Sequence, residues 1–205
     1  MSHLRSDFST SVNAAEHLDA EIAEHAAVAA RTRDAMASEF PPLVAACAHA
    51  LRSGHKLLLF GNGGAAAAAQ HIATELVVRY SRESGNRRPM AAIALTTDTS
   101  ALTAIGNDFG FDDLFARQVE ALCRPGDVAI GISTSGNSEN VVRGLRAAKV
   151  AGAVTVGFAG DSGGRLAELV DHRIFVPSAS TARVQEMHMV LGYALCALLE
   201  KDAVR

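Results

Sequence analysis

The feature that most constrains the fold of this chain is a repeated unit: a short apolar segment, a turn rich in Gly, Ser or Thr, and a helical segment. Apolar strands that alternate with helices form a parallel sheet covered on both faces. The polar turns follow the strands, and therefore gather at the edge where such sheets bind ligands. We expect an α/β fold with three α/β/α layers and a five-stranded parallel sheet. The predicted strands are residues 56–60, 90–95, 127–132, 154–158 and 173–176.

The first quarter of the chain differs from the rest. Residues 11–52 contain no Gly and are rich in Ala, Glu, His and Leu, which predicts helices, the second one starting at Pro41-Pro42. An Ala-rich, weakly amphipathic helix such as 12–37 is typical of subunit packing. We expect one domain, 1–205, with an N-terminal helical segment (1–52) that serves oligomerisation and an α/β core (53–205). The further predicted helices are residues 65–80, 139–151, a short one near 166, and 181–201.

The composition excludes several classes of partner. The formal net charge is −3 and the basic residues are dispersed, which is unlike a surface that binds nucleic acid. Three distant cysteines, Cys47, Cys123 and Cys196, are typical of reduced thiols in the cytosol. No apolar run reaches the length of a membrane span, and the N-terminus has no apolar signal core. We expect a cytoplasmic protein that binds neither nucleic acid nor membrane.

The segment Ser133-Thr134-Ser135-Gly136-Asn137-Ser138, called the serine loop below, joins a predicted strand to a predicted helix. Its four hydroxyls and the N–H groups of the following helix can donate hydrogen bonds to an anion. The alternative is an ordinary helix cap, but a cap needs only one such residue. We therefore predict a phosphate site in this loop. The turn Gly61-Asn62-Gly63-Gly64 lies at the same edge, where a tight turn alone would use the same residues.

Two predicted helices carry polar residues among apolar ones. His71 and Glu75 are four residues apart and share a helix face. Such a pair can hold a divalent metal ion or act as acid and base, or can be a solvated pair without function. The last helix carries Gln185 and His188, with Tyr193 two turns beyond Gln185. These groups can converge with the first pair.

Several ordered motifs resemble the sugar isomerase (SIS) domain family, and within it the phosphoheptose isomerases. The resemblance covers most of the chain, from about Gly54 to Glu200. It rests on Gly61-Asn62-Gly63-Gly64, Gln70-His71, Glu75-Leu76, and the segments 95–100, 102–110, 115–119, 131–138 and 183–188.

The resemblance implies a flavodoxin-like sheet and a homotetramer with sites at subunit interfaces. The implied reaction converts sedoheptulose 7-phosphate into D-glycero-D-manno-heptose 7-phosphate through an enediol, the first step towards nucleotide-activated heptose. The implied catalytic positions are Glu75 and Tyr193, and the implied ligands of one zinc ion per subunit are His71, Glu75 and Gln185. The substrate-binding residues implied are Asn62, Gly63, Thr97, Asp98, Asn107, Asp108, Ser133, Thr134, Ser135, Ser138 and Gln185.

Three residues depart from the family pattern. Ala65 replaces a Ser, Ala68 replaces an Asp, and Tyr193 replaces a His that is both catalytic and a zinc ligand. A tyrosine can donate a proton, but its ordinary pKa of about 10 makes it a poor base at neutral pH. Tyrosine is also a less usual zinc ligand than histidine.

Three functions remain open from the sequence. The first is an isomerase with Glu75 as base and Tyr193 or His188 as acid. The second is a non-catalytic adaptor of the type that binds the bacterial replication initiator. The third is a sugar-phosphate sensor, which needs the serine loop but not Glu75.

Overall fold

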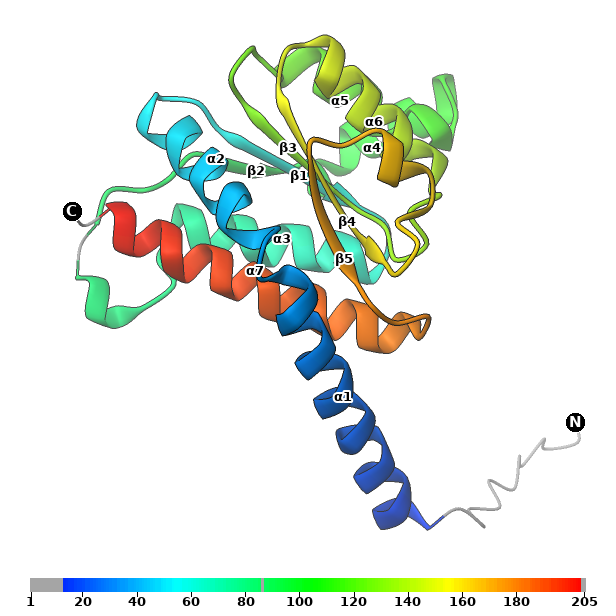
Figure 1. Cartoon of the computed structure of the whole chain (residues 1–205). Helices are drawn as coiled ribbons and strands as arrows, with labels where there is room; N and C mark the ends of the chain where they lie inside the picture. Colours follow the sequence, from blue (N-terminus) through cyan, green and yellow to red (C-terminus); the bar gives the residue numbers. More distant parts are fainter. Residues whose placement is uncertain (1–12, 86, 204–205) are drawn as a thin grey trace, which may run out of the picture.

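The computed structural model describes residues 13–85 and 87–203, and its centre is a five-stranded, fully parallel sheet (Figure 1). The strand order is β2-β1-β3-β4-β5, so the predicted three-layer α/β fold is confirmed. The second strand is shorter than predicted, because Met90 donates its N–H to the carbonyl of Leu76 at the end of a helix and not to a strand. The strands are β1 (Leu57–Gly61), β2 (Ala92–Ala94), β3 (Val128–Ile132), β4 (Val154–Gly160) and β5 (His172–Val176).

Helices cover both faces of the sheet. Successive strand residues point to opposite faces, so Leu57 and Leu59 join one apolar core while Leu58 and Phe60 join the other. The first core is closed by α2 (Phe40–Arg52), α3 (Gly64–Val77) and α7 (Thr181–Ala203). The second is closed by α5 (Ala116–Leu122), α6 (Glu139–Val150) and the short helix η3 (Gly164–Glu168).

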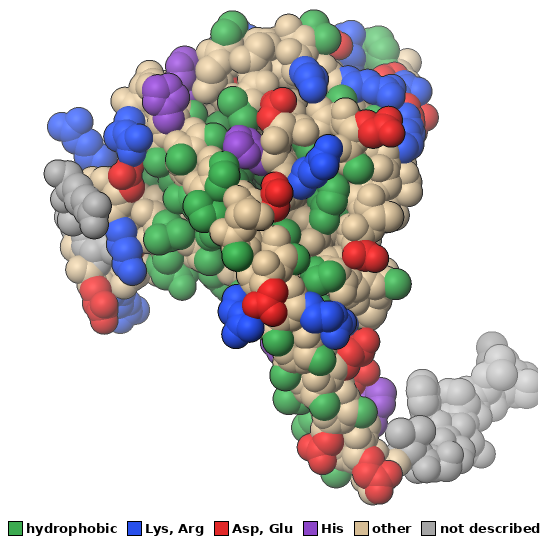
Figure 2. All heavy atoms as spheres, in the orientation of Figure 1, with side chains coloured by type: hydrophobic (Ala, Val, Ile, Leu, Met, Phe, Trp, Pro, Cys, Tyr) green, Lys and Arg blue, Asp and Glu red, His purple; other side chains and the backbone are tan. Residues whose placement is uncertain are grey.

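Helix α1 (Ala14–Met36) extends away from the body of the molecule (Figure 1). The side chain of Asn13 caps it by accepting the N–H of Ala15 at 3.1 Å. Its C-terminal half contributes buried residues to the core, whereas Leu18 and Ile22 in its N-terminal half are about 60% exposed. Figure 2 shows apolar side chains along this helix and on the adjoining face of the body.

The sequence did not predict the helices between β2 and β3, which are α4 (Thr99–Asp108), η2 (Phe111–Asp113) and α5. Helix α4 buries no residue and contains Thr, Ser and Gly, so it has neither an apolar stripe nor strong helix propensity. Helix α5 has seven residues, too few for a periodic pattern. A third short helix, η1 (Arg82–Ser84), follows α3, which ends at Val77 and not at residue 80.

The chain reverses direction across the sheet between β1 and β3, because β2 lies on one side of β1 and β3 on the other. Ligands of such sheets bind in the crevice at this switch point. Asn62, just after β1, and Asn140, in the first turn of α6, exchange two hydrogen bonds of 2.8 and 2.9 Å there. In residues 13–85 and 87–203, no helix is long and apolar enough to cross a membrane.

Candidate active site

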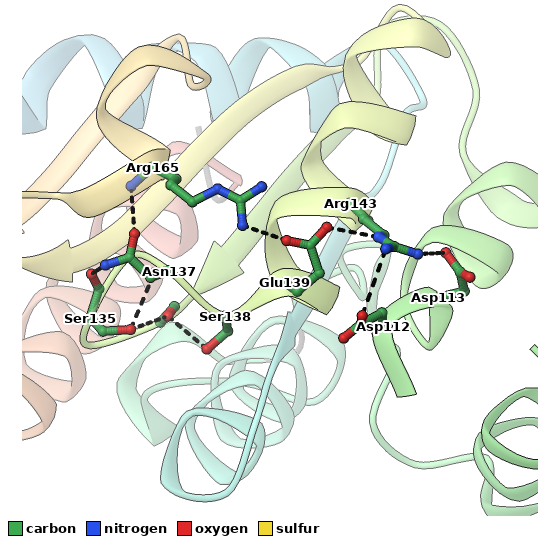
Figure 3. Close-up of polar contacts among 9 residues, drawn as sticks. Asp112, Asp113, Ser135, Asn137, Ser138, Glu139, Arg143 and Arg165 are labelled. Atoms are coloured by element: carbon green, nitrogen blue, oxygen red, sulfur yellow. Dashed lines mark hydrogen bonds and ion pairs between the residues drawn. The ribbon is translucent and has the colours of Figure 1, made fainter. Parts of the chain in front are cut away.

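The serine loop follows β3 and gathers its hydroxyls in one place (Figure 3). The hydroxyl of Ser133 donates to that of Ser138 at 3.0 Å and lies 3.5 Å from that of Ser135. Ser138 occupies the N-cap position of α6, yet its side chain makes no capping hydrogen bond. The hydroxyl cluster is therefore not explained by helix capping. The N–H groups of the first turn, which have no partner within the helix, lie beside it.

The serine loop is held against the turn that follows β4. Gly136 has a positive φ of 66°, and a Cβ there would lie 2.0 Å from the carbonyl oxygen of Gly163. Asn137 bridges the same two segments, because its side-chain oxygen accepts the N–H of Arg165 at 3.1 Å and its amide donates to the carbonyl of Ser135 at 2.9 Å. Only a glycine permits this approach of the two backbones.

An ion-pair cluster begins at the residue after the serine loop. Glu139 accepts a hydrogen bond from Arg143 at 2.8 Å and pairs with Arg165, and Arg143 continues to Asp113 at 2.8 Å (Figure 3). The hydrogen bonds from Arg143 and Arg165 lower the pKa of Glu139 to about 2. This cluster was not predicted from the sequence, in which the signal for one pair is the i,i+4 spacing of Glu139 and Arg143.

A second part of the site is a hollow of about 390 Å³ between the start of α3 and α7. Gln185 reaches across it from α7, since a Cβ on Gly64 would lie 2.8 Å from the Gln185 side-chain nitrogen. Ile132, directly before the serine loop, lines the same hollow, as do Ala65 and Ala68. Ala65 and Ala68 stand where the family usually has larger polar residues. These two alanines therefore enlarge an apolar part of the hollow.

His71, Glu75 and Tyr193 form one contact group. Nε2 of His71 lies 3.2 Å from the carboxylate of Glu75 and 2.9 Å from the hydroxyl of Tyr193. The rings of His71 and Tyr193 meet edge to face with centroids 5.3 Å apart. Glu75 is half-buried, and the two aromatic residues are partly open to solvent. The structure thus brings into contact three of the four residues for which the resemblance implies proton transfer or metal binding, the fourth being Gln185.

These side chains fit a metal ion only in part. The 3.2 Å between His71 Nε2 and the Glu75 carboxylate is close to the ~3.3 Å expected between two ligand atoms of one tetrahedral zinc ion. The further donors, Gln185 and Tyr193, offer neutral oxygen atoms. Within residues 13–85 and 87–203, no group of three or more His, Cys, Asp or Glu residues could hold a metal ion.

His188 is buried, whereas Tyr193, the other candidate acid, is exposed. His188 is 1% exposed, its Nε2 lies 3.2 Å from the carbonyl oxygen of Ala159, and its Nδ1 is buried without a partner. Burial lowers the pKa of His188 to about 4, so the imidazole is uncharged near neutral pH and cannot act as an imidazolium acid. The geometry favours Tyr193 over His188 as the acid.

The other predicted substrate-binding residues divide into two groups. Near the sheet edge, Gly63 starts α3 with φ 56°, Thr97 donates to the carbonyl of Ala94 at 3.2 Å, and Asp98 caps α4. Asn107 and Asp108 end α4, about 12–14 Å along the helix axis from its start. Their side chains share a hydrogen bond of 2.7 Å.

Comparison with known proteins agrees with this fold and site. Residues 22–160 match the SIS domain family, and the chain is a member of that class of proteins. A phosphoheptose isomerase of Aquifex aeolicus is 61% identical over 154 residues, which are 75% of this chain and 79% of the relative. A phosphoheptose isomerase of Paramagnetospirillum magneticum is 54% identical, and the match covers 92% of this chain and 97% of the relative. Within the SIS domain class, this chain belongs to the phosphoheptose isomerase family.

Solved structures give the same result. The phosphoheptose isomerase of Neisseria gonorrhoeae superposes with a TM-score of 0.84 at 40% identity, covering 91% of this chain and 98% of that one. The phosphoheptose isomerase of Francisella tularensis superposes with a TM-score of 0.85 at 30% identity, covering 93% and 100%.

Proposed function

We propose that this protein is an aldose–ketose isomerase that converts sedoheptulose 7-phosphate into D-glycero-D-manno-heptose 7-phosphate. The observation that carries the proposal is that Ile132 links the hollow beside His71 to the serine loop. The hollow that His71 lines is also lined by Ile132, which leads directly into the serine loop. A phosphate held by the hydroxyls of Ser133, Ser135 and Ser138 therefore leaves the rest of an extended sugar chain next to the proton-transfer residues.

The chemistry follows from the contacts of Glu75. Its carboxylate takes a proton from C1 of the ketose while the oxygen on C2 receives one, which gives the enediol. Returning a proton to C2 while the oxygen on C1 loses one completes the aldose. Tyr193 is the donor to the C2 oxygen, because its hydroxyl lies in the contact group of His71 and Glu75. Nε2 of His71 lies between the two groups and keeps the hydroxyl and the carboxylate on one side of the site.

Zinc is the metal we propose for this site. His71, Glu75 and Gln185 would hold it, with the hydroxyl of Tyr193 as the nearest further oxygen. A bound zinc ion supplies a Lewis acid that polarises the sugar carbonyl.

We further propose a cytoplasmic homotetramer. The apolar residues Leu18 and Ile22 on the protruding α1 support an assembly through the N-terminal helices.

The adaptor and sensor alternatives receive less support. Neither needs a carboxylate in contact with a histidine, and the Glu75–His71 contact is present. The relatives at 61% and 54% identity are named phosphoheptose isomerases. Loss of the family's histidine at Tyr193 remains the observation that favours a non-catalytic protein.

Turnover of sedoheptulose 7-phosphate by the purified protein, with and without added zinc, tests the proposal. We expect conversion to the aldoheptose phosphate by the normal protein and loss of conversion in Glu75→Gln, with ligand affinity within about twofold, since the carboxamide keeps the shape but cannot accept the proton. Binding without turnover in the normal protein would instead establish a sensor. Absence of both would overturn the phosphate site as well.

A further inference from the structure

The serine loop ends at a carboxylate, which is an unusual neighbour for a phosphate. Glu139 directly follows Ser138, whose hydroxyl is one of the three that converge. An uncompensated negative charge at this distance would repel a phosphate dianion. Two arginines, Arg143 and Arg165, pair with Glu139, and Arg143 also pairs with Asp112 and Asp113. The five side chains together carry a charge of −1, but the carboxylate of Glu139 itself contacts two cations.

The same pairs connect three separate segments of the chain. Arg143 lies one turn along α6 and continues to Asp113 in η2, while Arg165 lies in η3, after β4. Arg165 therefore ties the start of α6 to η3, and Arg143 ties the same turn of α6 to η2. In Figure 3 the hydroxyls of Ser135 and Ser138 converge, and Glu139 with its ion pairs lies beside Ser138.

Backbone contacts couple this cluster to the hydroxyls. Arg165 donates its backbone N–H to Asn137, whose own N–H donates to the hydroxyl of Ser135 at 3.2 Å. Leu166 donates to the carbonyl of Gly136 at 3.3 Å. A shift of η3 relative to α6 would therefore move the loop that orients Ser135.

We propose that Glu139 is a positioning residue which, by pairing with Arg143 and Arg165, holds the serine loop against η3 and keeps its hydroxyls gathered for the phosphate of the substrate. This inference rests on the proposed function. It assigns Glu139 and Arg165 to substrate recognition although neither needs to touch the sugar.

The experiment compares Glu139→Gln, Arg165→Met and Arg165→Lys by the KM and kcat for sedoheptulose 7-phosphate and by competition with inorganic phosphate. The positioning role predicts that Glu139→Gln raises KM and weakens phosphate inhibition about fivefold, the equivalent of an ion pair worth about 1 kcal/mol. A purely electrostatic role predicts the opposite sign, because removing a negative charge beside the phosphate would tighten binding. The kcat value is expected to stay within about twofold, since Glu75 and Tyr193 are unchanged.

Arg165→Met should weaken binding to a similar degree, and Arg165→Lys should restore part of it, because lysine keeps the charge but not the planar fork. The double variant Glu139→Gln/Arg165→Met should cost less than the sum of the single changes. Two matched controls on the same elements, Arg146→Met in α6 and Glu168→Gln in η3, are exposed and should leave KM unchanged.

The outcomes separate this inference from the function on which it rests. Ser135→Ala tests phosphate recognition itself, and a normal protein that neither binds nor turns over the sugar phosphate would refute the proposed function. If Ser135→Ala weakens binding but Glu139→Gln and Arg165→Met leave KM unchanged or lower it, the positioning role is wrong. Melting temperatures identify a variant that fails to fold, in which case Arg165→Lys alone decides, because a KM equal to that of the normal protein would refute the role.

Discussion

The hydroxyl of Tyr193 lies 2.9 Å from Nε2 of His71, the same nitrogen that lies 3.2 Å from the carboxylate of Glu75. The phenol therefore contacts a proposed metal ligand, His71, which in turn contacts the proposed base, Glu75. It occupies the position at which the family usually has a histidine. The substitution leaves a proton donor in the site, although the donor differs in charge and in affinity for zinc.

Removing this hydroxyl tests its role directly. We expect Tyr193→Phe to lower kcat about a hundredfold, the lower range for loss of a general acid, while KM changes little because the ring and its contact with His71 remain. Steady-state kinetics with sedoheptulose 7-phosphate measures both constants. An unchanged kcat would exclude Tyr193 from proton transfer.

Restoring the family residue gives the complementary prediction. Tyr193→His should raise the affinity for zinc, because an imidazole is a stronger zinc ligand than a neutral phenol. Metal content after dialysis against a graded series of chelator concentrations measures this without reference to activity. Tyr193→Phe serves as the matched control and should bind zinc no more tightly than the normal protein. Equal zinc content in all three proteins would show that residue 193 is not a ligand.

The sequence predicted the sheet and the serine loop because both are local patterns. A run of apolar residues followed by Ser and Gly can be recognised within one short segment of the sequence. By contrast, the contact of His71 with Tyr193 joins residues 122 positions apart, and that of Glu139 with Arg165 joins residues 26 apart. The first was expected only from the resemblance to a known family. The second was not expected at all, since charged residues on exposed surfaces carry no periodic signal.

Helix α4 was not predicted because its sequence also lacks a local pattern that indicates a helix. Its start is determined by Asp98, whose side chain accepts the N–H of Ala101 at 3.0 Å, and no residue of the helix is buried. Hydrophobic periodicity, the main sequence signal for a helix, is therefore absent.

The buried ion pair of Arg87 and Glu200 joins the segment between η1 and β2 to α7 at 2.6 Å, with both side chains 2% exposed or less. Arg87 also donates to the backbone carbonyl of Glu75 at 2.8 Å, so the pair supports the helix that carries the proposed base. We expect Arg87→Met to lower the free energy of unfolding by about 3–5 kcal/mol, because it removes the positive charge from a buried ion pair, while the backbone N–H groups of Tyr80 and Ser81 still donate to Glu200. Urea unfolding measures the change.

The exposed pair of Arg52 and Asp202 is the matched control for this measurement. Its side chains are 59% and 37% exposed, so Arg52→Met should cost less than about 1 kcal/mol. Similar losses for the buried and the exposed pair would contradict the prediction.

Gly136 offers a test of the backbone contact beneath the serine loop. Gly136→Ala would place a Cβ 2.0 Å from the carbonyl oxygen of Gly163, at a φ of 66°. We expect a loss of about 3 kcal/mol in stability and weaker binding of the sugar phosphate. Gly106→Ala is the control, because a Cβ there meets nothing within 4 Å in helix α4, and it should stabilise the protein by about 1 kcal/mol. A neutral Gly136→Ala would mean that the two segments separate easily.

The buried His188 makes stability depend on pH in a defined window. Its pKa is lowered by burial from 6.5 to about 4, so below pH 6.5 the unfolded chain binds a proton that the folded chain does not. The free energy of unfolding is therefore greatest above pH 6.5 and falls as the pH drops towards 4, by roughly 3 kcal/mol in total. Glu139, with its pKa lowered from 4.5 to about 2, adds a loss only below pH 4.5.

Urea unfolding at pH 7.0, 6.0 and 5.0 isolates the contribution of His188 from that of Glu139. His188→Gln keeps a donor for the carbonyl of Ala159 but cannot become charged, so its stability should change less over this range than that of the normal protein. His17→Gln, an exposed change on α1, should leave the dependence as it was. A steep dependence that survives His188→Gln would assign the titration to another group and show that the folded protein admits a proton at His188.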